Sequence, residues 1–204
     1  MPAATNLRRI LPRLWSWHAY APEVKVDLFA CALKSEAGLV LVDPIALDEI
    51  GLKVLASHGP VHAIVVTNAN HARQASEFKS SWNVPILAHP DAVSGLEISV
   101  DGLLQAGDSI GGGDIQVLDL PGGGAGEIAL YDRSGRIHFG DAVVNLESTG
   151  LCLLPNKYCS DPAQLKRSVA ALAGLKADVI TFAHGAPLIA PLGAGLDLIV
   201  SLAL

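Results

Sequence analysis

Short apolar runs rich in β-branched residues are the feature that most limits how this chain can fold. Residues 38–42 (GLVLV), 62–67 (HAIVVT) and 177–183 (ADVITFA) each read as a buried β-strand. Segments with helical spacing of apolar residues alternate with these runs, for example at 46–59 and 72–82. This order predicts a mixed α/β protein with sheets inside and helices outside.

The predicted order along the chain is a strand-rich block, a block of alternating strands and helices, a second strand-rich block and a second alternating block. The second strand-rich block covers 115–144, and a helix is predicted at 161–175 with Asp161 as its N-cap. A final helix is expected from Leu192 onwards. Because neither a linker nor a low-complexity segment is visible, a single domain covering 1–204 is predicted.

Composition narrows the classes of partner. The chain carries a formal net charge of -6 and has no basic block, so nucleic acid is not an expected partner. The C-terminal residues are very apolar, but prolines, glycines and Asp197 interrupt them, which argues against a membrane span. An apolar helix there is expected either inside its own subunit or at a homodimer interface.

Cysteine usage indicates a reducing compartment. The chain has three cysteines, Cys31, Cys152 and Cys159, and no CxxC motif. An odd number without metal-ligand spacing predicts neither a disulfide framework nor a zinc ribbon. We therefore expect reduced thiols in a cytoplasmic protein.

Polar residues gather where the predicted strands end. Asp43 follows the first buried strand, the stretch 67–73 (TNANHAR) follows the second, and Asp141 and His184 follow two later ones. A glycine-rich turn in LPGGGAGEIALY (120–131) lies between them, and such turns let backbone approach a ligand closely. Taken singly, each has a structural explanation as a turn former, a hairpin loop or a satisfied histidine.

Their order along the chain resembles that of the metallo-β-lactamase superfamily. The resemblance runs from LVDP through VVTNANHAR, LPGGGAGEIAL and IHFGDAVV to TFAHGAP. It implies an αββα sandwich fold. It also implies a strand-end Asp, a T-H-x-H-x-D-H turn, a P-G-H-T-x-G turn, a G-D and a final His before Gly. In the family these side chains bind one or two metal ions, commonly zinc, and a metal-bound hydroxide is the nucleophile of the hydrolytic members.

The sequence departs from that family pattern at most of the ligand positions. Thr67 matches, but asparagines stand at the first two histidine positions, and Ala72 and Arg73 replace the next aspartate and histidine. The ligand histidine of the glycine turn is replaced by Gly123. The ligand positions retained are Asp141 and His184. The replaced ligand positions are Asn68, Asn70, Ala72, Arg73 and Gly123. His71 is a further pocket candidate, at a position that faces away from the metals in the family pattern.

These replacements predict a degenerate metal site. Zinc requires about three or four nitrogen, sulfur or carboxylate ligands, and an arginine has no lone pair to offer. We therefore expect no bound cofactor, with zinc as the alternative. In the metal's place Arg73 is expected to pair with Asp141, and Asn68, Asn70 and His184 to complete the hydrogen bonds. The residues expected to converge at one edge of the sandwich are Asp43, Thr67, Gly123, Asp141 and His184.

Three functions are compatible with the sequence. The leading one is a protein that does not carry out two-metal hydrolysis and that either binds a small molecule or serves in a complex. The second is a hydrolase with an altered site. It would either cage one ion with His71, Asp141, His184 and an asparagine, or use His184 as a metal-free base with Arg73 as oxyanion stabiliser. The third is a structural or partner-binding role through the apolar tail.

Overall fold

The first of two β-sheets is formed by the N-terminal half of the chain. The computed structural model describes residues 3–190, 192 and 194–204. Seven strands follow one another across this sheet in chain order. They are β1 (Arg8–Leu11), β2 (Leu14–Ala21), β3 (Val26–Lys34), β4 (Leu39–Val42), β5 (Val61–Val66), β6 (Ile86–Ala88) and β7 (Gly102–Leu103). Strands β4 to β7 pair in parallel, and the earlier strands pair in antiparallel fashion.

The second sheet has six strands, and a separate hairpin stands beside it. The order across the sheet is β15 (Leu188–Ile189), β14 (Val179–Phe182), β11 (Arg136–Phe139), β10 (Ile128–Asp132), β9 (Ile115–Asp119) and β8 (Ser109–Ile110). The hairpin consists of β12 (Val143–Leu146) and β13 (Gly150–Leu153). Within the strand-rich block predicted at 115–144, residues 140–142 separate β11 from β12.

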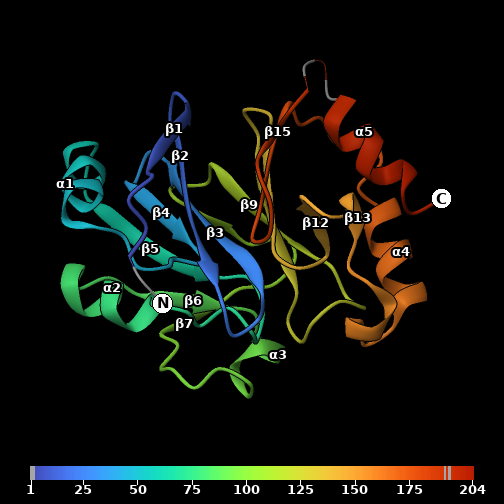
Figure 1. The fold of residues 1–204 in the computed structure, drawn as a ribbon, viewed down its shortest axis with the longest axis horizontal. Coiled ribbons are helices and arrows are strands. Elements are labelled where there is room, and N and C mark those ends of the chain that lie inside the picture. Colours follow the sequence, from blue (N-terminus) through green and yellow to red (C-terminus); the bar gives the residue numbers. More distant parts are fainter. Residues whose placement is uncertain (1–2, 191, 193) are drawn as a thin grey trace.

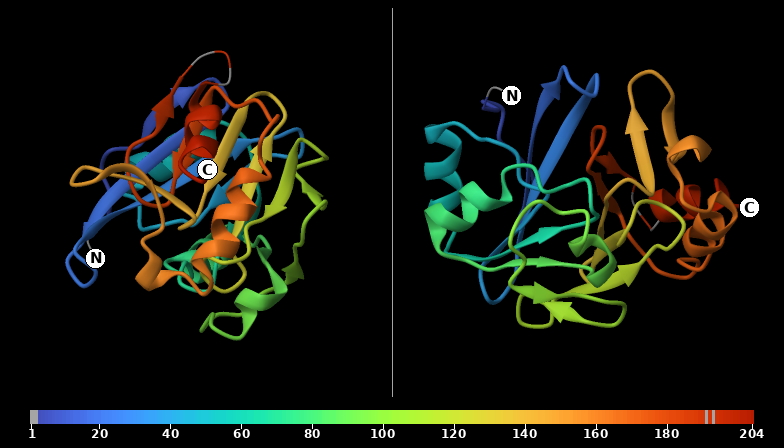
Figure 2. Two further views of the ribbon diagram at one scale, coloured as in Figure 1. Left: turned by 90° about the vertical axis from the view of Figure 1, so that its right-hand side faces the viewer. Right: turned by 90° about the horizontal axis from the view of Figure 1, so that it is seen from below.

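The helices cover the outer faces of the two sheets. Figure 1 shows α1 and α2 outside the first sheet and α4 and α5 outside the second, and Figure 2 shows the same layering from two further directions. The helices are α1 (Glu49–Ser57), α2 (Ala75–Trp82), α3 (Pro90–Val93), α4 (Pro162–Ala170) and α5 (Ala194–Ser201), with a 3-10 turn, η1, at Asn156–Tyr158. Asp161 caps α4 by accepting a hydrogen bond from Gln164 N, as predicted. The expected α/β sandwich is confirmed.

Three apolar layers explain why the strands read as unbroken apolar runs. In β4, Leu39 and Leu41 pack towards α1 and α2, whereas Val40 and Val42 pack between the two sheets. A third layer joins the second sheet to α4 and α5. Because both faces of the central strands are buried, alternation of polar and apolar residues is absent from them.

The C-terminal helix belongs to this third layer. Leu196, Ile199 and Val200 are buried against it, whereas Leu198 is half exposed. A helix was expected from Leu192, and α5 begins at Ala194; residues 191 and 193 lie outside the described part of the chain. Among the described residues no helix is long and apolar enough to cross a membrane. The homodimer interface stays a prediction.

Candidate functional site

Asp43 and Thr67 join the ends of the parallel strands β4 and β5. Asp43 Oδ1 accepts from the Thr67 N–H at 2.8 Å, and its Oδ2 accepts from the Thr67 hydroxyl at 2.5 Å. Both residues are fully buried. Asp43 has φ of +47°, a left-handed conformation that aspartate tolerates better than most residues. Parallel pairing brings the ends of β4 and β5 to the same sheet edge, so this contact follows from the strand order.

His71 is held against Asp43 from the turn after β5. Its Nδ1 lies 2.8 Å from Asp43 Oδ2 and 2.9 Å from Thr67 Oγ1. The opposite ring nitrogen, Nε2, lies 3.3 Å from Asp141 Oδ1. In the family pattern this position faces away from the metals, whereas here the buried Asp43 carboxylate fixes the ring with Nε2 towards the pocket.

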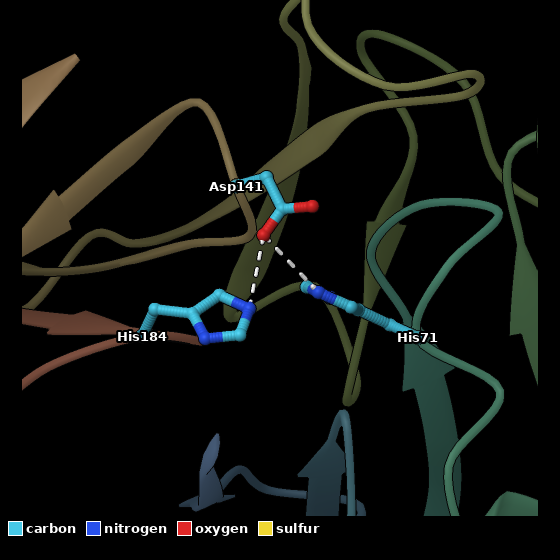
Figure 3. A group of neighbouring side chains, drawn as sticks. All are labelled: His71, Asp141 and His184. Atoms are coloured by element: carbon cyan, nitrogen blue, oxygen red, sulfur yellow. Dashed lines mark ion pairs between the residues drawn. The ribbon is translucent and has the colours of Figure 1, made fainter. Parts of the chain in front are cut away.

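Three side chains of types that can bind a metal ion meet at one point of the site. His184 Nε2 lies 3.2 Å from the same Asp141 oxygen that His71 Nε2 approaches, as Figure 3 shows. One ligand atom from each of the three residues lies within 4.8 Å of the other two. His184 is oriented from behind by the backbone oxygen of Asp27, 3.2 Å from its Nδ1. The cluster thus draws on the ends of three different strands.

Two glycines allow the close approaches that place this cluster. A Cβ at Gly140 would lie 2.6 Å from Thr67 Oγ1, so only glycine lets the chain enter Asp141 beside the β5 turn. At Gly185, with φ of +111°, a Cβ would lie 1.9 Å from the backbone oxygen of Asn145 in β12. These contacts fix Asp141 and His184 through backbone packing.

The charges in the cluster balance one another. Burial alone would raise the pKa of Asp141, but His71 and His184 hold it well below its ordinary value. Burial alone would lower the pKa of His71, but Asp43 and Asp141 raise it to about 9. His71 is therefore protonated at neutral pH and serves as the counter-ion of two carboxylates. The depressed pKa expected for Asp141 is found, with the histidines in the place expected for Arg73.

Asn68 holds its side-chain amide in one orientation. Its Oδ1 accepts from the Asn70 N–H at 2.8 Å, so its NH₂ group necessarily faces the other way. Nδ2 donates to Asp141 Oδ2 at 3.1 Å and to Glu127 Oε2 at 2.8 Å. A group that presents two N–H bonds to the site offers no lone pair to a cation there.

Glu127 fills the space beside Gly123. A Cβ on Gly123 would lie 3.2 Å from Glu127 Cγ. The carboxyl group is buried, and Oε1 accepts from the Ala142 N–H at 2.9 Å. Burial and then the neighbouring Asp141 raise the pKa of Glu127 to about 8. An uncharged acid thus occupies the volume next to the position where the family pattern has a ligand histidine.

Arg73 bridges the two sheets through backbone oxygens. Its guanidinium donates to Phe29 O at 2.6 Å, Asp43 O at 3.0 Å and Ala183 O at 3.2 Å. The prediction that Arg73 forms an ion pair with Asp141 is wrong. The physical reason is that His71 and His184 already supply that carboxylate's partners. The planar guanidinium matches one carbonyl in β3 and two in the residues that directly follow β4 and β14.

Arg73→Ala is expected to lower the free energy of unfolding by on the order of 3 kcal/mol, because the partly buried carbonyls of Phe29 and Asp43 lose the guanidinium as donor and that of Ala183 keeps only the Phe29 N–H. Arg73→Lys should recover only part of this loss, since an ammonium cannot reproduce the fork. Denaturant unfolding checks both variants, with the exposed Arg8→Ala as the control. A loss below about 1 kcal/mol for Arg73→Ala would contradict the bridging role.

A pocket of about 670 Å³ opens above the cluster. Its floor carries the three clustered residues with Asn70 and Arg73. Apolar walls come from three segments: the β2–β3 hairpin, β12, and residues 154–158. The volume falls within the range of small-molecule sites, about 300–1,000 Å³.

The residues expected to converge at one edge form separate contact pairs within the site. Asp43 and Thr67 form one contact pair, and Asp141 and His184 form another, linked by His71. Gly123 packs on Glu127 behind them.

Asn70 and Arg73 line the same pocket from the turn after β5. The Asn70 side chain, expected beside Asp141, has no hydrogen-bond partner among the described residues.

Two buried residues were missed by the sequence reasoning. Glu127 gave one weak signal, a charged residue between a glycine turn and an apolar strand. His138 gave none: it lies inside β11, with Nδ1 2.9 Å from Thr181 Oγ1 and Nε2 3.8 Å from Asp43 Oδ2. It packs behind Asp43, away from the pocket lining.

Comparison with known proteins agrees with this architecture. The sequence model described as metallo-beta-lactamase superfamily matches residues 6–186. The DIM-1 metallo-beta-lactamase has a TM-score of 0.77 at 17% identity, over 99% of this chain and 97% of that one. The FIM-1 enzyme from Pseudomonas aeruginosa, solved in a mono-zinc form, gives 0.74 at 18% identity, over 99% and 95%.

A third similar structure holds a different metal. TTHA1623 in a di-iron-bound form gives a TM-score of 0.65 at 22% identity, over 89% of this chain and 96% of that one. Among curated proteins no significant match was found. At these identities the structural likeness establishes the fold, while the site chemistry has to be argued from this chain's own residues.

Proposed function

Because the chain belongs to the metallo-β-lactamase superfamily, we propose that it is a member that binds a small molecule in the pocket and does not carry out two-metal hydrolysis. The proposal rests on the volume and walls of the pocket together with the loss of the second metal's ligands. The unpaired, reduced state of Cys31, Cys152 and Cys159 supports a cytoplasmic location for this protein.

One observation carries the case against two metals. The Asn68 amide is fixed with its N–H bonds towards Asp141, so the first ligand position of the family turn presents donors where a cation needs lone pairs. Ala72 offers no ligand atom, and Gly123 packs on Glu127. The residues present therefore do not fit a dinuclear centre.

A second candidate, hydrolysis with a single metal ion, is favoured by the meeting of His71, Asp141 and His184. Two ligands of one tetrahedral zinc, each about 2.0–2.1 Å from the ion, lie roughly 3.4 Å apart. The two histidine Nε2 atoms lie 3.3 and 3.2 Å from the shared Asp141 oxygen, and all three ligand atoms lie within 4.8 Å of one another. The Nδ1 atoms of both histidines lie near oxygen acceptors, Asp43 Oδ2 for His71 and Asp27 O for His184. Such hydrogen bonds orient the histidine ligands of metal sites. These residues fit one ion, which would act as a Lewis acid towards a bound carbonyl.

Metal stoichiometry tests the proposal. Protein purified without chelator and then titrated with zinc is expected to hold at most one ion per chain by elemental analysis and calorimetry. Any such ion should be lost in Asp141→Ala and kept in His62→Gln, whose side chain is exposed on β5.

Two outcomes would change the assignment. About two ions per chain, both dependent on Asp141, would contradict the proposal outright. One ion accompanied by chelator-sensitive turnover of a lactam, thioester or phosphodiester would establish the second candidate instead. Hydrolysis without metal has less support, because Arg73, its oxyanion stabiliser, is engaged by three carbonyls.

A further inference from the structure

The floor of the pocket has little hydrogen-bonding capacity left for a ligand. Both ring nitrogens of His71 and of His184 face protein acceptors. Asp141 receives both histidines on one oxygen and Asn68 on the other. The two terminal nitrogens of the Arg73 guanidinium donate to backbone carbonyls. A ligand that relied on these groups would have to break buried contacts.

Asn70 is different from its neighbours on the floor. Its backbone N–H donates to Asn68 Oδ1, which fixes the residue in the turn. Its side chain is exposed and lines the pocket, and within the described residues its carboxamide has no hydrogen-bond partner. It therefore presents a neutral donor and a neutral acceptor side by side.

The floor also favours an uncharged ligand. Among the described lining residues, one carboxylate, Asp141, and one guanidinium, Arg73, are both already engaged by protein partners. An anion would meet Asp141, and a cation would meet Arg73, with no unengaged opposite charge among these lining residues. For either ion, contacts in the pocket would not offset the free-energy cost of lost hydration.

The walls select for an apolar body. Val26 and Leu28 come from the β2–β3 hairpin, Val144 and Leu146 from β12, and Leu154 from the segment beyond β13. These side chains face the opening between two structural hairpins. Contact with them rewards apolar surface at about 25 cal/mol per Å² removed from water.

We propose that the ligand of this pocket is an uncharged, largely apolar molecule carrying an amide group, and that Asn70 selects it by pairing carboxamide with amide. This inference rests on the proposed small-molecule function and specifies its ligand class. Asn70 acts as a specificity-determining residue: its C=O accepts the ligand N–H, and its NH₂ donates to the ligand C=O.

Three ligands with one apolar body and different head groups test the assignment. The probes are 4-phenylbutanamide, 4-phenylbutanoate and 4-phenylbutylamine, titrated into chelator-treated, isotope-labelled full-length protein and followed by NMR. The amide is expected to bind at least about tenfold more tightly than either ion and to shift resonances of the pocket residues. Asn70→Leu should weaken amide binding about fivefold to tenfold, as expected for loss of hydrogen bonding.

The controls separate this inference from the function on which it rests. Gln105→Leu, which removes an exposed carboxamide outside this pocket, should leave amide binding unchanged. Carboxylate or amine binding at least as tight as that of the amide, or an unchanged amide affinity in Asn70→Leu, would overturn the inference alone. If none of the probes shifts any pocket resonance, and neither does butylbenzene, the small-molecule function fails as well.

Discussion

Asp43→Ala is expected to lower the free energy of unfolding by about 3–5 kcal/mol at neutral pH. The carboxylate is fully buried and accepts from the Thr67 N–H, the Thr67 hydroxyl and His71 Nδ1. Its removal leaves a buried backbone donor without an acceptor and a buried imidazolium without one of its two counter-ions. Denaturant unfolding at pH 7 measures the loss directly.

The stability loss in Asp43→Ala should become smaller as the pH falls. Burial alone would raise the pKa of Asp43, but His71, His138 and Arg73 hold it far below its ordinary value. A carboxyl with a lowered folded pKa contributes stability above its unfolded pKa, and that contribution is lost as the pH falls towards the folded one. The gap between wild type and Asp43→Ala should therefore narrow below about pH 4.

A surface aspartate provides the comparison for this experiment. Asp91 has a side chain that is 79% exposed, so Asp91→Asn should change stability by less than about 0.5 kcal/mol. A comparably small effect for Asp43→Ala, or a gap that does not vary with pH, would show that the carboxylate is not held as described.

Glu127→Gln is expected to abolish the fall in stability that Glu127 itself causes in the wild type between pH 4.5 and 8. Above about pH 6.5 His71, whose pKa is also raised, adds a fall of its own that the variant keeps. Burial and Asp141 raise the pKa of Glu127 from 4.5 to about 8, so across this window the folded protein keeps a proton that the unfolded chain releases. Stability then decreases by about 1.4 kcal/mol per pH unit within the window. Glutamine does not titrate, so the variant loses this slope.

The loss of the pH slope in Glu127→Gln can be distinguished from an effect of the substitution on stability that does not vary with pH. Glutamine has a single oxygen for two donors, the Asn68 amide and the Ala142 N–H, so the variant should also be less stable by an amount that does not vary with pH. Unfolding free energies at pH 4.5, 6 and 8 distinguish the two effects, with the exposed Glu97→Gln as control. Parallel pH curves for wild type and Glu127→Gln would refute the assignment of a buried neutral acid.

Strand-end reasoning predicted much of the site because backbone topology decides it. Parallel strands end at the same edge, so Asp43 and Thr67 had to meet once β4 and β5 were recognised as neighbours. Asp141 and His184 follow β11 and β14, which also pair in parallel. Positions after paired strands are fixed by the sheet, and a sequence pattern is enough to find them.

Side-chain direction inside the turn could not be read in the same way. A sequence motif gives the position of His71 in the turn. The direction of its ring is set by its strongest buried partner, which is Asp43. Arg73 has φ of +40°, a backbone state that nothing in the sequence announces. Its three carbonyl acceptors come from residues 29, 43 and 183, and backbone oxygens leave no signature in a sequence. The predicted Arg73–Asp141 pair failed for this reason.

Glu127 limits how metal ligands could be added to this site. A histidine at Gly123 needs volume that Glu127 occupies, and Asn68→His removes the amide that Glu127 and Asp141 share. Either substitution alone thus crowds Glu127 or removes a hydrogen-bond donor from two buried carboxyl groups. A design that adds metal ligands at these two positions therefore begins with a smaller, uncharged residue at position 127.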